Sequence, residues 1–207
     1  MKPILFYDTE TTGLPLWNEP SESPDQPHIT QLAAELCDVD SGRVLGFMDM
    51  LIKPEGWTIP AELEELIGIT NDLAERFGHP IEEAMRAFIR LWSMSDLRCG
   101  HNESFDARMV RIELFRLSPE QENEIHGAWK AAPAFCTQGN SVKIINLPPT
   151  EKMIKAGRRH AKSPNLGEAF EFFTGTKLEG AHNAAVDLAA CKAVYFGIAA
   201  HRAQAAA

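Results

Sequence analysis

The sequence predicts an α/β protein in which helices cover both faces of a mixed five-stranded sheet. One observation is the order of the segments: three strand-like segments come first, and helical and strand-like segments alternate after them. Another is the short turn Asp40-Ser41-Gly42 between the second and third segments, which favours an antiparallel hairpin. Strands that alternate with helices form a sheet between two helical layers, so this order predicts a mixed sheet with both faces covered.

Each expected strand is an apolar, aromatic or β-branched segment that ends at turn residues. The expected strands are Ile4–Tyr7, Ile29–Val39, Val44–Ile52, Leu97–Cys99 and Ala134–Thr137. Between the first two, Leu16–His28 is rich in proline and polar residues, which predicts a mobile loop.

Helices are expected where apolar residues recur at helical spacing or follow a capping residue. Pro80 opens one helix, in which Ile81, Met85 and Phe88 recur at that spacing. The expected helices are Ala61–Ile67, Thr70–Phe77, Pro80–Trp92, Phe105–Leu117, Ser118–Trp129, Asn165–Phe173 and one from about Asn183 to Ala200. The segment Asn140–Ser163 shows no clear period.

The composition is that of an ordinary globular protein, with 44% hydrophobic and 24% charged residues among 207. This length suits one domain, which we expect over residues 1–200, with an Ala-rich tail over 201–207. The net charge of −9 argues against a protein that binds nucleic acid by charge alone. It does not exclude a nucleic-acid enzyme, because acids that surround metal ions contribute to the sum.

Cysteine usage and the N-terminus predict a cytoplasmic protein. The four cysteines are far apart and form no CxxC pair, which indicates reduced thiols rather than disulfides or a zinc site. Asp8 interrupts the only apolar N-terminal run, so no signal peptide is predicted. The segment Ala184–Ala200 contains Asp187 and Lys192 and is too short to span a bilayer comfortably, so no membrane association is predicted.

Asp8 and Glu10 follow directly on the first strand. Residues two apart in a strand point the same way, so their carboxylates should lie side by side. At about 4 Å and an effective dielectric of about 20, their repulsion costs roughly 4 kcal/mol. A hard divalent cation with oxygen ligands would offset it. A strand end with two solvated acids fits this short pattern equally well.

Asp106 lies in Gly100–Asp106, which follows the fourth strand and starts a helix. If that strand is parallel to the first, Asp106 reaches the same end of the sheet as Asp8, where ligand sites form in open α/β sheets. The alternative is an ordinary helix N-terminus, at which Asn102 or Ser104 caps the helix and Asp106 complements its dipole.

Asp187 lies in the apolar helix that begins near Asn183, where an unpaired carboxylate would cost several kcal/mol. No Arg or Lys precedes it by one turn, and Lys192 lies on a different face. A metal ion shared with Asp8 and Glu10 would compensate its charge. His182 is expected on the loop that enters this helix, where the N-terminus keeps it neutral and able to accept a proton at pH 7. A lone histidine there is more often a capping residue.

Together these segments resemble the DEDDh branch of the DnaQ-like 3′-5′ exonuclease superfamily, which includes the epsilon proofreading subunit of DNA polymerase III. Three motifs match in the family's order: Phe6–Leu14, His101–Asp106 as HN-x-x-FD, and His182–Asp187 as H-x-A-x-x-D. The departures are Ile67 in place of a histidine, Cys136 in place of an aspartate and the long Leu16–His28 loop, and none removes a metal ligand.

The resemblance implies a ribonuclease H-like fold and release of nucleoside 5′-monophosphates from nucleic acid 3′ ends, with single-stranded DNA favoured. It implies two divalent ions, Mg²⁺ or Mn²⁺, held by the carboxylates of Asp8, Glu10, Asp106 and Asp187. His182 would take the proton from the attacking water. The implied nucleotide-binding residues are Thr11, Thr12, Leu14, Asn102 and Phe105. A DNA polymerase partner is implied for a proofreading member.

Other interpretations stay open. An exoribonuclease of the same superfamily would share every motif. An aspartyl phosphatase would use Asp8 as a nucleophile and leave His182 without a role, and a non-catalytic polymerase- or nucleic-acid-binding module would not need the acids. The basic stretch Lys152–Lys162 either contacts phosphates along the strand or is a solvated loop. The sequence does not indicate an oligomeric state.

Overall fold

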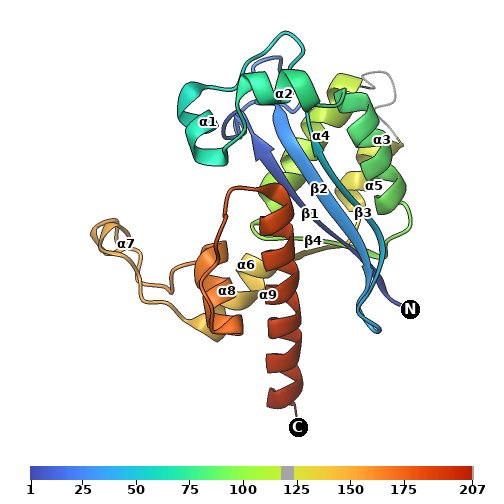
Figure 1. Cartoon of the computed structure of the whole chain (residues 1–207). Coiled ribbons are helices and arrows are strands. Elements are labelled where there is room, and N and C mark those ends of the chain that lie inside the picture. Colours follow the sequence, from blue (N-terminus) through green and yellow to red (C-terminus); the bar gives the residue numbers. More distant parts are fainter. Residues whose placement is uncertain (118–123, 207) are drawn as a thin grey trace.

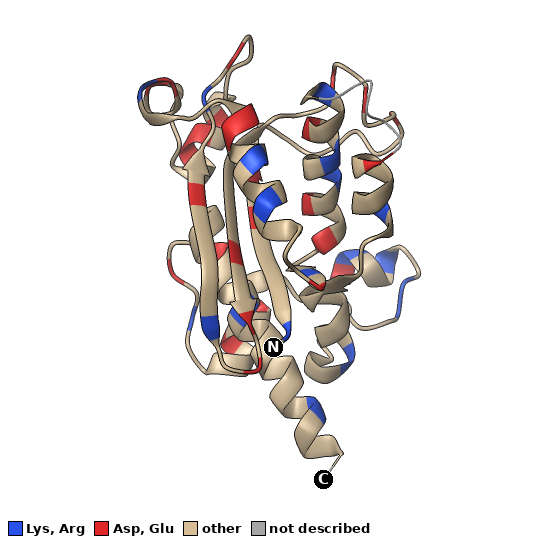
Figure 2. Ribbon diagram, turned by 90° about the vertical axis from the view of Figure 1, so that its right-hand side faces the viewer, with Lys and Arg blue, Asp and Glu red and all other residues tan. Residues whose placement is uncertain are grey.

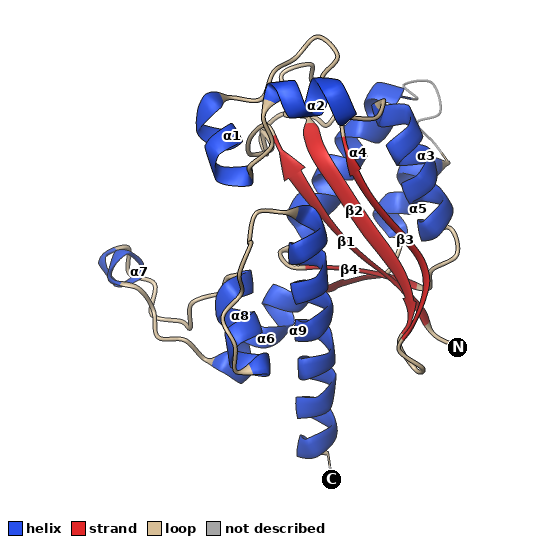
Figure 3. Ribbon diagram, viewed as in Figure 1, coloured by secondary structure: helices blue, strands red, loops and turns tan. Residues whose placement is uncertain are grey.

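Five strands form one mixed sheet in the computed structural model, which describes residues 1–117 and 124–206. The strands are β1 (Pro3–Thr11), β2 (Ile29–Asp38), β3 (Arg43–Leu51), β4 (Leu97–Gly100) and β5 (Ala134–Cys136). Their order is β3-β2-β1-β4-β5; β1 is antiparallel to β2 and parallel to β4 (Figure 3). The predicted mixed sheet, including the β2–β3 hairpin, is confirmed.

Helices cover both faces of this sheet, as predicted (Figure 1). Their bounds are α1 (Ala61–Ile67), α2 (Asn71–Phe77), α3 (Ile81–Trp92), α4 (Glu103–Leu117), α5 (Ile125–Ala131), α6 (Thr137–Ile145), α7 (Glu151–Lys155), α8 (Leu166–Thr174) and α9 (Ala184–Ala205). The helix expected from Ser118 begins outside the described residues, and α5 lies in its second half.

The alternation of β1 explains why the two layers form. Leu5 and Tyr7 point to one face, where they pack with α3, α4 and Trp129 of α5. Ile4 and Phe6 point to the other face, where they pack with α9. Because residues two apart share a face, one strand whose apolar residues Ile4–Tyr7 are all buried anchors both layers. It also fixes the carboxyl end of β1 between the first turns of α4 and α9.

The segment Asn140–Ser163 differs from the prediction because it contains regular structure. The second half of α6 lies in it, and Thr150 caps the five-residue helix α7 by accepting a hydrogen bond from Met153 N. Thr137, expected in the last strand, is the first residue of α6. Helices this short carry too few residues to display a period. In Figure 1, α7 projects away from the sheet.

The helix α9 runs further than expected, to Ala205, so part of the predicted tail is helical. This helix has 22 residues and a mean hydropathy of 1.2 over its most apolar window. Among the described residues, it is the one helix that is long and apolar enough to cross a membrane. A helix that packs on a protein core satisfies the same two criteria. Leu188 and Cys191 of α9 are buried against the sheet, and Val194 and Ile198 pack with α8.

The Leu16–His28 loop follows a fixed path against α4, whereas the sequence suggested a mobile loop. The buried Gln26 side chain donates to the carbonyls of Leu16 and Pro20 and accepts from Leu16 N. Arg111 donates to Ser21 Oγ at 2.8 Å, and Arg116 donates to the carbonyl of Pro27 at 2.9 Å. The two arginine contacts join residues about 90 positions apart in the sequence, so no local sequence pattern predicts them.

Replacing Gln26 with Ala is expected to lower the free energy of unfolding by about 1–3 kcal/mol, because the loop loses the hydrogen bonds of a buried amide. We expect faster proteolysis within residues 16–28 and a lower denaturation midpoint. Gln204→Ala, at the exposed end of α9, is the matched control and should change neither quantity. Equal protease resistance in the two variants would mean that Gln26 does not hold the loop.

Candidate active site

Four carboxylates meet at the carboxyl end of β1. Asp8 and Glu10 lie on β1 itself, and Asp106 and Asp187 lie in the first turns of α4 and α9. Because β4 is parallel to β1, the chain that leaves β4 delivers Asp106 to this end, as the sequence predicted. Thr9 donates from its backbone N and from Oγ1 to Asp106 Oδ1, at 3.0 and 2.8 Å, and so fixes that carboxylate.

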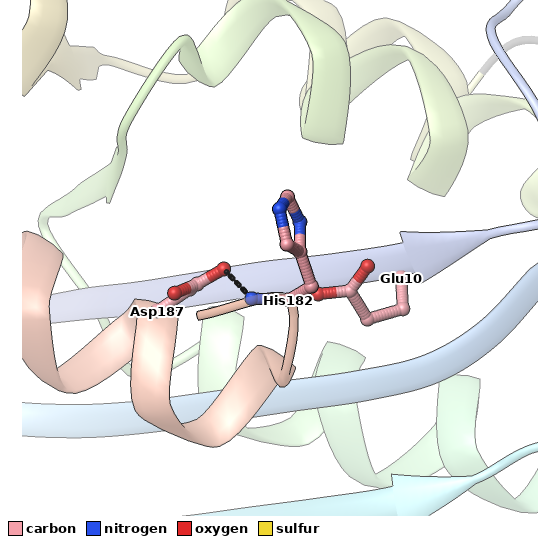
Figure 4. Close-up of side chains that lie close together, drawn as sticks. All are labelled: Glu10, His182 and Asp187. Carbon is pink, nitrogen blue, oxygen red and sulfur yellow. Dashed lines mark hydrogen bonds between the residues drawn. The ribbon is translucent and has the colours of Figure 1, made fainter. Parts of the chain in front are cut away.

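Asp187 lies beside Glu10 and His182, as Figure 4 shows. One ligand atom from each of these three residues lies within 4.8 Å of the other two. The backbone N of His182 donates to Asp187 Oδ2 at 3.0 Å. The other oxygen, Asp187 Oδ1, is buried and has no hydrogen-bond partner among the described residues. A buried carboxylate oxygen of this kind requires a compensating group.

The residues that precede α4 and α9 adopt a left-handed backbone conformation, which orients the chain that carries Asp106 and Asp187. Asn102 has φ 62° just before α4, and His182 has φ 67° two residues before α9. Asn183 then caps α9 by accepting hydrogen bonds from Ala185 N and Val186 N. The left-handed turn explains why the backbone of His182 can reach Asp187, although an ideal helix would place the two residues far apart in rotation.

The electrostatics of the site follow from burial and mutual repulsion. Burial, followed by the charges of Asp106, Asp187 and Glu10, raises the pKa of Asp8 well above its usual range. Burial and the neighbouring aspartates raise the pKa of Glu10 to about 8, and burial raises the pKa of Asp106 to about 7. Burial also raises the pKa of Asp187. The four acids therefore lie close enough to disfavour one another's ionisation.

The donor set fits a divalent cation. None of the ion pairs between described residues involves any of these four carboxylates, so protein cations do not neutralise them. Carboxylate oxygens are the ligands that Mg²⁺, Mn²⁺ and Ca²⁺ prefer. The unpartnered Asp187 Oδ1 is a position where such an ion would satisfy a buried oxygen.

The residues expected to bind nucleotide lie around the same end of the sheet, but they differ in accessibility. Leu14 is 78% exposed, and Asn102 is exposed. The hydroxyl of Thr11 donates to Gly13 O, and the hydroxyl of Thr12 accepts from His28 N. Phe105 is partly buried against the α3–α4 core cluster.

Sequence reasoning did not assign a role to three buried residues behind the site. Tyr7 donates through its hydroxyl to Glu103 Oε1 at 2.8 Å, and Arg98 Nε donates to the same oxygen at 2.6 Å. Glu103 is the first residue of α4, so this pairing holds the helix that carries Asp106. The arginine also lies over the Trp129 ring, at 4.1 Å from its centroid.

His101, the first residue of the second motif, has a structural position. Its Nδ1 lies 2.9 Å from Thr137 Oγ1 and its Nε2 lies 3.2 Å from Pro164 O. Burial lowers its pKa to about 4. The imidazole is therefore neutral at physiological pH and links β4 to α6 and to the segment before α8.

Comparison with known proteins is consistent with this geometry. A family model described as RNase_T, exonuclease, matches residues 5–195. The chain belongs to this exonuclease family. The predicted resemblance to the DnaQ-like superfamily is thereby confirmed; a closer relation to the epsilon proofreading subunit stays a prediction. The sequence has no significant match among curated proteins.

Solved structures show that the exonuclease-family chain shares its fold with exonuclease I. The E. coli exonuclease I complex with a dT13 oligonucleotide aligns with a TM-score of 0.70 at 18% identity, over 96% of this chain and 40% of that chain. A zinc-bound E. coli ExoI–ssDNA complex aligns with a TM-score of 0.69 at 18% identity, over 98% of this chain and 41% of that chain. A product-bound exonuclease I aligns with a TM-score of 0.67 at 18% identity, over 95% of this chain and 43% of that chain. The chain thus spans about two fifths of these proteins and has the predicted ribonuclease H-like fold.

Proposed function

We propose that this protein is a metal-dependent 3′-5′ exonuclease that releases nucleoside 5′-monophosphates from the 3′ end of single-stranded DNA. The observation that carries the proposal is the buried, unpartnered Asp187 Oδ1 among four carboxylates, in a chain of the exonuclease family. The matched exonuclease I structures contain dT13 and dA16 oligonucleotides, which supports DNA as the substrate. We further propose one exonuclease domain over residues 1–200, a cytoplasmic location and, for a proofreading role, a DNA polymerase partner.

We assign the four carboxylates to two ions, Mg²⁺ or Mn²⁺. Asp8, Glu10 and Asp187 would hold the first ion, and Asp8 and Asp106 the second. When bound, two such ions stabilise charge on the attacking and the leaving oxygen of an in-line displacement at phosphorus. Thr9 contributes by holding Asp106 in place.

His182 is assigned as the base that takes the proton from the attacking water. Its side chain is exposed at the mouth of the site and lies near Glu10 and Asp187. An exposed imidazole can take up a proton from a water molecule and return it to solvent. An aspartyl phosphatase would leave this histidine unused, so its position favours the exonuclease.

The terminal nucleotide is assigned to the loop after β1 and to the start of α4. Leu14 offers an exposed apolar side chain to the base, and Asn102 offers an exposed amide. Thr12 Oγ1 accepts from His28 N and would donate its own proton to the nucleotide, whereas Thr12 N already donates to His28 O. Thr11 Oγ1 donates to Gly13 O and would hold the turn in shape. Phe105, partly buried, would support the sugar from the side of α4.

A nuclease panel tests the function. The substrates are 5′-labelled single- and double-stranded DNA and RNA of one sequence, with the metal removed by EDTA and then restored. We expect stepwise shortening of single-stranded DNA from its 3′ end, only in the presence of Mg²⁺ or Mn²⁺. Faster loss of RNA would make the protein an exoribonuclease. Absence of shortening on every substrate, or shortening that survives EDTA, would contradict the proposal.

Replacing His182 with Asn is expected to lower turnover about 10²–10⁴-fold, the range typical of a lost general base. Asparagine tolerates the left-handed backbone of this position, so the loop should keep its shape. Mn²⁺ affinity, measured by calorimetry, should stay within about threefold of the parent protein. A loss of metal affinity of tenfold or more would identify His182 as a ligand rather than a base.

A further inference from the structure

The face of α4 that points away from Asp106 forms a basic groove, which we define by Arg108, Arg111 and Lys130. These three side chains line two adjoining pockets of about 260 and 390 Å³. Arg108 and Arg111 lie on α4 and Lys130 lies on α5, which pack together on one side of the sheet. Figure 2 looks onto this side, where Lys and Arg positions appear along the helices.

The charges in the basic groove are incompletely compensated. Burial and the nearby charge of Arg111 lower the pKa of Arg108, so the two guanidinium groups lie close together. The acids that line the two pockets are Glu22 and Glu103, and Glu103 is already paired with Arg98. Arg108 Nη2 donates to the carbonyl of Glu19, whereas its buried Nε has no hydrogen-bond partner among the described residues. This local excess of positive charge occurs in a protein of net charge −9.

An aromatic and apolar rim connects the basic groove with the end of β1. Trp17 lines the first pocket and is 57% exposed. Leu14 and Leu16, on the same loop, are 78% and 40% exposed. Exposed aromatic rings next to a cationic groove are the combination that binds single-stranded nucleic acid: bases stack on the rings and phosphates meet the cations.

We propose that the single strand upstream of the 3′-terminal nucleotide passes over Leu14–Trp17, stacks a base on Trp17 and places phosphates in the basic groove. The inference rests on the proposed function, because it extends the same strand. Arg111 is five residues beyond Asp106, about 7.5 Å along the axis of α4 and rotated by about 140°. The strand therefore has to turn around the start of α4, a path that only substrates of several nucleotides can span.

Fluorescence anisotropy in EDTA tests the groove without turnover. The probes are 5′-labelled dT2 and dT16, and the variants are Lys130→Gln and Trp17→Ala. Lys143→Gln, which removes an exposed lysine on α6, is the matched control. For dT16 we expect each variant to bind at least about fivefold more weakly. Lys130→Gln should also reduce the slope of log K against log salt by about 0.7 for one lost phosphate contact.

For dT2 we expect both variants and the control to stay within about twofold of the parent protein. Unchanged dT16 affinity in both variants overturns the inference. An equal loss for dT2 and dT16 also overturns it, because the effect would not depend on length. Binding of labelled polyglutamate in the absence of any dT16 binding would assign the groove to an acidic peptide and overturn the inference. If the protein degrades no substrate in the nuclease panel but still binds dT16 more tightly than dT2 through these side chains, the proposed exonuclease function is rejected and the proposed strand-binding groove is retained.

Discussion

Replacing Asp8 with Asn is expected to lower exonuclease turnover by at least about a thousandfold, and at pH 8 to make the metal-free protein more stable. Asp8 is central to the carboxylate cluster, since Asp106, Asp187 and Glu10 all raise its pKa. The amide keeps the shape of the side chain but removes a charge that metal ions need and that the neighbouring acids repel. Turnover on single-stranded DNA and the melting temperature in EDTA are the measurements.

The matched control for this variant is Asp72→Asn, which neutralises an exposed aspartate on α2. The control should retain turnover and should not gain stability. A gain of about 1 kcal/mol for Asp8→Asn would raise the melting temperature by about 2–4 °C in a protein of this size. Turnover above a tenth of the parent value, or a lower melting temperature than the control in EDTA, would show that Asp8 is not in a repulsive metal-binding cluster.

Metal-free protein is expected to lose stability between about pH 5 and pH 8 and to regain it when Mg²⁺ or Mn²⁺ is added. The pKa of Glu10 is raised to about 8 and that of Asp106 to about 7. Their ordinary values lie near 4 in the unfolded chain, so between these limits the folded protein binds more protons. Its stability therefore falls as pH rises through this window and levels off above pH 8.

Melting curves at pH 5.5 and 8, each with EDTA or with the metal, separate the effect of pH on stability from the effect of metal binding. At pH 8 a metal present at about 100 times its dissociation constant adds about 2.7 kcal/mol, or roughly 5–10 °C. At pH 5.5 the gain should be smaller, because protons compete with the ion. A melting temperature at pH 8 that does not change with Mg²⁺ or Mn²⁺ up to millimolar concentrations would contradict a clustered metal site.

The sheet and the convergence of the acids could be predicted because local patterns determine them. Ile4–Tyr7 is a continuous apolar run that leads to Asp8, and such a run predicts a central strand with its carboxylates at the exit. The parallel pairing of β4 with β1 then determined where Asp106 arrives. The last helix was predictable from its nearly continuous apolar composition, and a carboxylate in such a helix, Asp187, indicated that a compensating group lies nearby.

The remaining features depend on contacts between distant residues. The Leu16–His28 loop contains prolines and polar residues typical of a mobile segment, and its attachment to the fold depends on arginines from α4, which lie about 90 positions away. The pairing of Glu103 with Arg98 and Tyr7 joins three elements, and none of these residues stands out in its own segment. The helix α7 has five residues, too few for a periodic signal.

The left-handed conformations of Asn102 and His182 have a consequence for any attempt to engineer this enzyme. Glycine adopts such a conformation without steric penalty, so at His182 it would relieve on the order of 1 kcal/mol of backbone strain, whereas asparagine already tolerates the conformation at position 102. A selection for heat resistance alone would therefore favour glycine at position 182 and would discard the imidazole. Thermostabilised libraries of this protein need a simultaneous screen for nuclease activity, because this stabilising mutation lies beside the carboxylate cluster.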